Sequence, residues 1–170
     1  MKKIHTKINK ILDDLDITQA PIDLDKIINY LGLKIVYKPF DGDISGCLLR
    51  DREGNAIIGI NSAHHENRQR FTIAHEIGHY LLHSGEPTYI DRNNLERINF
   101  RSSFSDATNP IEEIQANKFA AELLMPQEML VEDIMNIENI EDTDFVDDLA
   151  KKYRVSKQAL TIRLTRLNLS

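Results

Sequence analysis

The sequence predicts a single domain of the α+β class, and three observations lead to this prediction. The chain has 170 residues, enough for one domain with a hydrophobic core and too few for two large ones. Apolar residues recur at helical spacing near both ends of the chain. Between them, residues 33–60 hold short β-prone runs separated by turn signals, so helices and a small sheet should share one core.

Two helices are predicted before any strand. Residues 4–15 place isoleucine and leucine at helical spacing over about four turns. Residues 22–31 form a shorter segment that follows Pro21, a residue favoured in the first helical turn, and ends before Gly32. A glycine at this place is typical of the left-handed residue that terminates many helices.

Three short strands are expected next. Residues 33–37, 44–49 and 56–60 are rich in β-branched and other apolar side chains. Turn signals at residues 41–43 and 51–55 separate them. Because short strands joined by tight turns usually pair with their sequence neighbours, we expect a small, mostly antiparallel sheet.

A helix over residues 66–83 carries the most informative motif of the chain, HExxH at residues 75–79. Histidines at positions i and i+4 lie one turn apart on the same face, where both rings can reach one metal ion. A glutamate directly after the first histidine, here Glu76, acts as a general base in such motifs. Gly78 costs about 1 kcal/mol relative to alanine, so a closely packed backbone or a passing substrate is expected beside it.

A catalytic metal needs a third protein ligand besides His75 and His79. The single cysteine excludes a thiolate-rich zinc site, so this ligand must be His, Asp or Glu. Glu112 and Glu113 open the next predicted helix, and both fall on its inward arc. Glu113 is slightly favoured because Ala116, one turn later, would let the helix approach its neighbour closely.

Three other histidines are rival ligands. His83 lies on the face of the motif but one turn too far for the same ion, and His64 and His65 precede the helix as expected loop residues. The outer face of the next helix is predicted to carry Gln115, Lys118 and Glu122.

Residues 84–110 are polar and long for a connection, with a strand fragment expected at 97–101. The helix over residues 111–124 follows and is stopped by Pro126. Beyond it the charge is segregated. Residues 128–148 hold nine acidic and no basic side chains, and the remaining residues hold six basic and no acidic ones. The two blocks are expected to compensate each other across packed helices.

Composition limits the location and the partners. No apolar run approaches the length of a membrane span, and the basic N-terminus is not followed by an apolar signal core, so we expect a cytoplasmic protein without a membrane partner. A net charge of −6 argues against a surface that follows a phosphate backbone along its whole length. Cys47 is interpreted as a small packed hydrophobe.

Two segments together resemble a known family. The segment 70–80, Arg70-Phe71-Thr72-Ile73-Ala74-His75-Glu76-Ile77-Gly78-His79-Tyr80, and the segment 113–126, from Glu113 to Met125-Pro126, are similar to the ImmA/IrrE metallopeptidases. The resemblance is strongest over residues 21–126 and weaker over residues 149–160.

The resemblance implies a fold and an activity. The fold would be a zincin-like metallopeptidase domain over residues 1–126, including the N-terminal helices, with a helix-turn-helix-like extension over residues 127–170 packed on it. The activity would be a zinc-dependent endopeptidase that cleaves a transcriptional repressor of a phage, a mobile element or a DNA-damage response. A metal-activated water would be the nucleophile.

Residue roles follow from the same resemblance. His75, His79 and Glu113 would be the metal ligands, and Glu76 would be the catalytic base. Asn117, one turn after Glu113, would support that glutamate by a hydrogen bond. Two histidines and a carboxylate suit zinc, although manganese or iron can occupy similar ligands.

Substrate binding leaves alternatives open. An exposed edge of the sheet, at residues 44–49 or 56–60, could hold an extended peptide by strand addition. The expected oxyanion donor is one of Tyr80, Tyr89, His83 and Arg101.

A different function is also open, because residues 149–167 imitate a helix-turn-helix. The chain would then be a metal-stabilised DNA-binding or adaptor protein of a mobile element that acts without proteolysis. The same pattern equally describes two terminal helices packed on the core. The side chains that could read bases are Ser156, Lys157, Gln158, Thr161 and Arg163.

Overall fold

The computed structural model describes residues 2–40, 44–50, 55–83, 109–136 and 145–169. The elements in chain order are α1 (Lys2–Asp14), α2 (Leu24–Tyr30), β1 (Lys34–Lys38), β2 (Gly46–Arg50), β3 (Ala56–Asn61), α3 (Glu66–Leu82), α4 (Pro110–Leu124), α5 (Gln127–Met135), α6 (Phe145–Tyr153) and α7 (Lys157–Leu167). The α+β class is confirmed.

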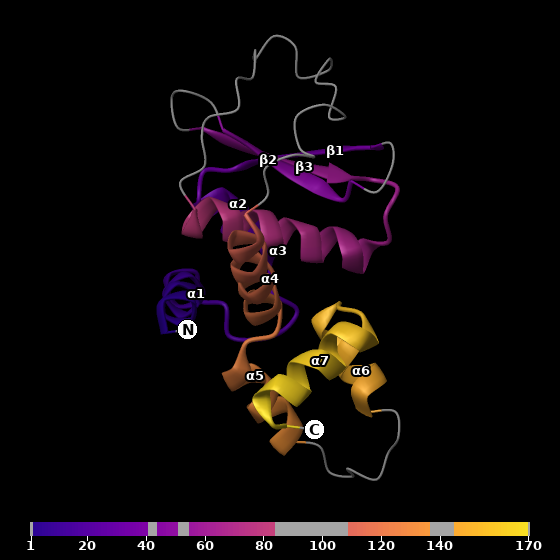
Figure 1. The fold of residues 1–170 in the computed structure, drawn as a ribbon. Coiled ribbons are helices and arrows are strands. Elements are labelled where there is room, and N and C mark those ends of the chain that lie inside the picture. Colours follow the sequence, from indigo (N-terminus) through magenta and orange to yellow (C-terminus); the bar gives the residue numbers. More distant parts are fainter. Residues whose placement is uncertain (1, 41–43, 51–54, 84–108, 137–144, 170) are drawn as a thin grey trace.

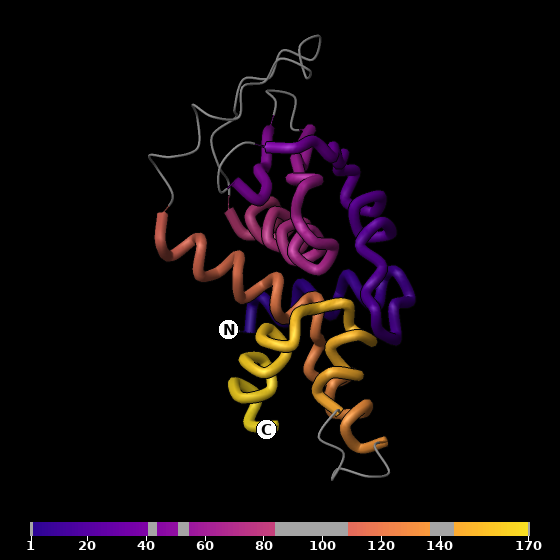
Figure 2. The backbone as a smooth tube through the Cα atoms, turned by 90° about the vertical axis from the view of Figure 1, so that its right-hand side faces the viewer, coloured from indigo at the N-terminus to yellow at the C-terminus, as the bar shows by residue number. Residues whose placement is uncertain are grey.

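The elements form layers around α3. Figure 1 shows the sheet on one side of α3 and α4 crossing on the other, with α5, α6 and α7 beyond α4. Figure 2 shows the same order from the side. One core connects the layers through fully buried side chains of α1, β3, α3, α4 and α7. These side chains include Ile8, Ile58, Ile77, Phe119 and Leu160.

The sheet is mixed, so the prediction of a mostly antiparallel sheet is wrong. The strand order is β1-β3-β2. β1 runs parallel to β3 with Ile35 opposite Ile58, whereas β2 runs antiparallel to β3 with Leu48 opposite Ile58. β3 separates the two strands that precede it because its apolar residues are buried over almost the whole strand, as a central strand requires.

The side chain of Asn61 ties the connection between β1 and β2 to the end of β3. Asn61 is 2% exposed. Its Nδ2 donates to the carbonyl of Ile44 at 2.9 Å, and its Oδ1 accepts from the backbone N–H of Phe40 at 3.2 Å. This buried amide therefore sets where β2 begins.

The helices lie close to their predicted positions, and their ends have local causes. α2 begins at Leu24 because Asp23 accepts a hydrogen bond from the backbone N–H of Lys26 at 3.0 Å. Gly32 follows α2 with a φ of +67°, which confirms the predicted left-handed residue. α4 begins with Pro110 after the capping residue Asn109.

α3 and α4 cross at Gly78. A Cβ atom at this position would lie 3.2 Å from the Cα of Ala116 and 3.2 Å from the Cβ of Phe119. The closely packed backbone expected beside Gly78 is therefore the backbone of α4.

One side of α4 that we predicted to be exposed is covered. Glu122 is 8% exposed, and Nδ1 of His5 in α1 donates to its Oε1 at 2.9 Å. The prediction that Glu122 lies on the outer face is wrong because α1 packs there, whereas Gln115 is exposed as predicted.

Ion pairs between the acidic and basic C-terminal blocks confirm the predicted compensation. Lys152 pairs with Asp133 at 2.5 Å, and Lys157 pairs with Asp147 at 2.9 Å. In addition, Nε of buried Arg163 donates to the carbonyl of Met125, across the predicted boundary between residues 126 and 127. The division into two units stays a prediction.

Two further predictions concern a membrane span and a strand fragment. No helix in the described ranges has the length and apolar run needed to cross a membrane. The strand fragment expected at residues 97–101 lies outside the described residues.

We expect Gly78→Val to destabilise the protein by about 2 kcal/mol, because the added methyl groups would overpack the crossing of α3 and α4. Urea denaturation measures this change. Gln115→Val, on the exposed face of α4, controls for the β-branched side chain and should change stability by no more than about 0.5 kcal/mol. Equal unfolding midpoints for the two variants would contradict the role of the close crossing.

Candidate metal centre

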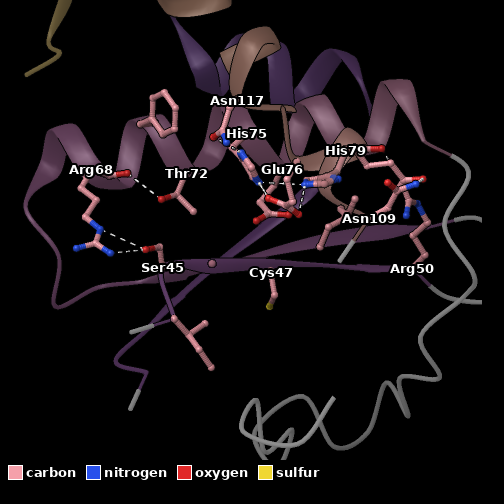
Figure 3. A pocket seen from close by; sticks show the side chains of 16 residues that line it. Ser45, Cys47, Arg50, Arg68, Thr72, His75, Glu76, His79, Asn109 and Asn117 are labelled. Atoms are coloured by element: carbon pink, nitrogen blue, oxygen red, sulfur yellow. Dashed lines mark hydrogen bonds and ion pairs between the residues drawn. The ribbon is translucent and has the colours of Figure 1, made fainter. Parts of the chain in front are cut away.

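Three side chains from two helices converge in a cleft between α3 and β2. His75 and His79 project from α3 (Figure 3), and Glu113 projects from the first turn of α4. The Nε2 atoms of the two histidines lie 3.0 Å apart. Glu113 places one carboxylate oxygen 3.3 Å from Nε2 of His75 and the other 3.2 Å from Nε2 of His79. The structure thus brings together the motif histidines and the favoured glutamate.

The geometry of this cluster fits a shared metal ion. Ligand atoms about 2.1 Å from a tetrahedrally coordinated ion lie about 3.4 Å from one another. The separations of 3.0, 3.2 and 3.3 Å are close to that value. Burial lowers the pKa of both histidines, which favours the neutral imidazole that metals bind. These three residues could therefore hold one divalent cation.

Asn117 of α4 orients one of the two rings. Its Oδ1 lies 3.1 Å from Nδ1 of His75, so the ring donates this proton to the amide and keeps Nε2 available for a metal. We expected Asn117 to support Glu113, which precedes it by one turn. The structure gives it a different partner because the crossing of the two helices brings its amide to α3.

Glu76 lines the cleft beside the histidines and is 8% exposed. Burial, and to a smaller extent the negative charge of Glu113, raise the pKa of Glu76 to about 8, and Arg50 acts in the opposite direction. A divalent cation nearby would lower this pKa again. A bound cation would thus favour the ionised carboxylate, the form that can accept a proton.

The rival ligands lie outside the cluster. Glu112 lines the cleft, but its Oε1 lies 3.5 Å from Nδ2 of Asn109, the residue that caps α4. His83 follows the end of α3, where it is the C-terminal cap. His65 caps the start of α3, and His64 precedes it in the loop, as expected.

The cleft has a volume of about 690 Å³ and runs along β2. A Cβ atom at Gly46 would lie 2.4 Å from Cγ2 of Thr72, so a glycine allows the strand and α3 to approach this closely. Since side chains alternate along a strand, Leu48 and Arg50 also face α3. Cys47 points away from α3 in Figure 3.

Two arginine side chains bridge α3 and the β2 segment, and sequence reasoning missed both. Nη2 of Arg50 donates to the carbonyls of His79 and His83 at 3.0 and 2.8 Å. Nη2 and Nε of Arg68 donate to Oγ of Ser45 at 2.8 and 3.2 Å. Figure 3 shows the two arginines at opposite ends of the cleft. No local spacing in the sequence signals either contact.

Cys47 and the candidate oxyanion donors were also predicted from the sequence. Burial raises the pKa of Cys47 to about 12, so its thiol stays protonated. This agrees with the prediction that Cys47 is a small packed hydrophobic residue. Among the oxyanion candidates, Tyr89 and Arg101 lie outside the described residues. The ring of Tyr80 lies 6.0 Å from the guanidinium of Arg50 and does not line the cleft.

The chain is similar to known proteins in both sequence and fold. The chain is 33% identical over 116 residues to the "Radiation response metalloprotease IrrE" of Deinococcus radiodurans. This match covers 68% of the chain and 32% of the relative. In fold, the chain resembles a solved structure titled "Mycobacterium tuberculosis transcriptional regulator", with a TM-score of 0.61 and 13% identity. That match covers 97% of this chain and 47% of the other.

The chain therefore spans about a third of the curated relative and just under half of the solved structure. The family described as "IrrE N-terminal-like domain" matches residues 28–165, a range that contains His75, His79 and Glu113. The resemblance to the ImmA/IrrE peptidases is thus confirmed, and the chain belongs to the peptidase family of IrrE N-terminal-like domains.

Proposed function

We propose that this protein is a zinc-dependent endopeptidase of zincin-like fold. The observation that carries the proposal is the convergence of His75, His79 and Glu113 within 4.8 Å of one another, beside the buried carboxyl group of Glu76. Two histidines and one carboxylate are a typical ligand set for a catalytic zinc ion, which leaves a coordination position open.

Each residue of the centre has a distinct task. A metal ion held by His75, His79 and Glu113 would polarise the scissile carbonyl and lower the pKa of water. Glu76 accepts the proton of the attacking water and passes it to the leaving amine. Asn117 keeps His75 in the tautomer whose Nε2 faces the centre.

The substrate is proposed to lie extended along β2. Residues 56–60 form the central strand, so they offer no free edge to a peptide. The backbone N–H of Asn61 donates to the carbonyl of Ser45, and bonded pairs alternate in an antiparallel ladder. Gly46, Leu48 and Arg50 therefore turn their backbone groups away from β3, where a peptide can bind by strand addition.

The proposed substrate is a transcriptional repressor. This part rests on the resemblance to the ImmA/IrrE family and on the name of the Deinococcus radiodurans relative, which describes a metalloprotease of the radiation response. An open cleft beside a strand edge that pairs with no other described strand suits a protein segment that can become extended.

DNA binding by α6 and α7 is less well supported. Arg163, which the sequence suggests as a base-reading residue, is 8% exposed and is bonded to a backbone carbonyl. Lys152 and Lys157 form ion pairs with Asp133 and Asp147. Neutralised or buried cations contribute little to phosphate binding, so the packed-helix interpretation is favoured.

Zinc should stabilise the folded protein through its ligands. Zinc at about 100 times its Kd should raise the free energy of unfolding by about 2.7 kcal/mol, and a chelator should reverse this gain. Thermal unfolding with and without zinc measures the effect. We expect His79→Ala and Glu113→Gln to abolish it, whereas Glu112→Gln, the matched change one residue earlier, should retain it. Loss of the gain in Glu112→Gln alone would contradict the assignment of Glu113.

Glu76→Gln should fold and bind zinc but lose peptidase activity. The amide keeps the shape of the side chain and cannot accept the proton, so kcat should fall by about 100-fold or more. Cleavage of candidate repressors from neighbouring genes, scored after co-expression, measures the effect. A variant that keeps its biological effect without cleavage would instead support the adaptor function.

Leu48→Pro tests the substrate edge. Proline removes a backbone donor that points away from β3, so the β2–β3 ladder should survive while peptide binding weakens. We expect a higher KM for repressor cleavage with unchanged zinc binding. Leu48→Ala shortens the same side chain but keeps the donor, and should cleave better than the proline variant. Equal KM values for the folded proline variant and the wild type would remove the strand-addition model.

A further inference from the structure

Arg50 ties the end of the motif helix to the end of β2. It is the last residue of the strand, its side chain is partly buried, and its guanidinium lines the cleft. Nη2 donates to the carbonyl of His79 at 3.0 Å and to that of His83 at 2.8 Å. One of these two acceptors belongs to the backbone of a candidate metal ligand.

Both carbonyls lie at the C-terminal end of α3. The last four carbonyls of an α-helix lack a complete set of intrahelical donors, and a cation near them is favoured by the helix dipole. α3 ends at Leu82, and His83 is its C-terminal cap. The carbonyl of His79 already accepts from the backbone N–H of His83 at 3.1 Å, so Arg50 is its second donor. An arginine can satisfy two acceptors at once with a planar group of fixed geometry. The C-terminal turn of α3 is thereby joined to β2.

We propose that Arg50 is a positioning residue of the metal centre. By holding the backbone of His79 against the end of β2, it keeps the Nε2 of this histidine at the distance from His75 and Glu113 that a shared cation requires. The inference rests on the proposed function only in that these three residues bind a metal. Neither the motif nor the resemblance assigns a role to Arg50.

Arg163 provides a matched comparison on the other ligand helix. Its Nε donates to the carbonyl of Met125, the C-terminal cap of α4, at 3.1 Å. Met125 follows Glu113 by twelve residues, which is about 18 Å along a helix. Both arginines therefore satisfy carbonyls at a helix end, but only Arg50 does so at a metal ligand.

The experiment compares zinc affinity in purified full-length wild type, Arg50→Gln, Arg50→Lys and Arg163→Gln. Metal-free protein competes with a chromophoric chelator for zinc, and thermal unfolding of the metal-free protein reports the loss of stability separately. Cobalt in place of zinc reports the coordination geometry by its visible absorption. None of these readouts depends on peptidase activity.

We expect Arg50→Gln to weaken zinc binding by about 10- to 100-fold, the usual effect of removing a group that orients a metal ligand. The cobalt spectrum should change as well. Arg50→Lys should recover part of the affinity, because an ammonium group keeps the charge but lacks the planar fork. Arg163→Gln should unfold at a lower temperature and bind zinc as the wild type does.

Wild-type affinity in Arg50→Gln, or an equal loss in Arg163→Gln, would overturn the proposal. If Arg50→Gln does not fold, Arg50→Lys decides: weaker zinc binding at a wild-type unfolding temperature supports the role, and unchanged binding rejects it. Absence of zinc binding in the wild type would instead reject the proposed metal centre, and the role of Arg50 with it.

Discussion

The tight crossing of α3 and α4 at Gly78 is the constraint on which the rest of the site depends. At Gly78 an added Cβ atom would lie 3.2 Å from the Cα of Ala116, closer than an ordinary van der Waals contact. Because Ala116 and Phe119 occupy that contact, the preceding turn of α4 places Glu113 beside both motif histidines. The absence of a side chain at Gly78 thus sets how close Glu113 comes to His75 and His79.

Distant segments of the chain hold the two ligand helices at their C-terminal ends. α3 is bonded there by Arg50 from β2, and α4 by Arg163 from α7. The proposed metal ligands lie differently relative to these contacts. His79 is close to the bonded end of α3, whereas Glu113 lies in the first turn of α4, far from its bonded end. The contact from β2 therefore holds the turn of α3 that carries His79. The contact from α7 holds the end of α4 that is distant from Glu113.

Features of the sequence with local causes were predictable, and features that depend on packing between distant segments were not. The HExxH helix, the glycine after α2 and the start of α4 follow from spacing and capping chemistry. The pairing of β1 with β3 could not be predicted in this way, because a short connection between β1 and β2 does not determine which strand pairs with β1. The buried, continuously apolar β3 did contain a sign that it is central.

The residues of the site were also only partly predictable from the sequence. Spacing left both Glu112 and Glu113 as candidates, and only the helix crossing separates them geometrically. The partner of Asn117 and the contacts of Arg50 join residues 29 to 42 positions apart, so no periodicity could signal them.

The outer edge of β2 has a consequence for the behaviour of the molecule in solution. Among the described residues no strand pairs with it, so its backbone groups are available to any extended chain, including a second copy of this protein. The strand is only five residues long, and short edge strands are less prone to such association. An edge strand that offers its backbone groups to a substrate can also pair with a second copy of the chain, and the short length of β2 reduces this risk of aggregation.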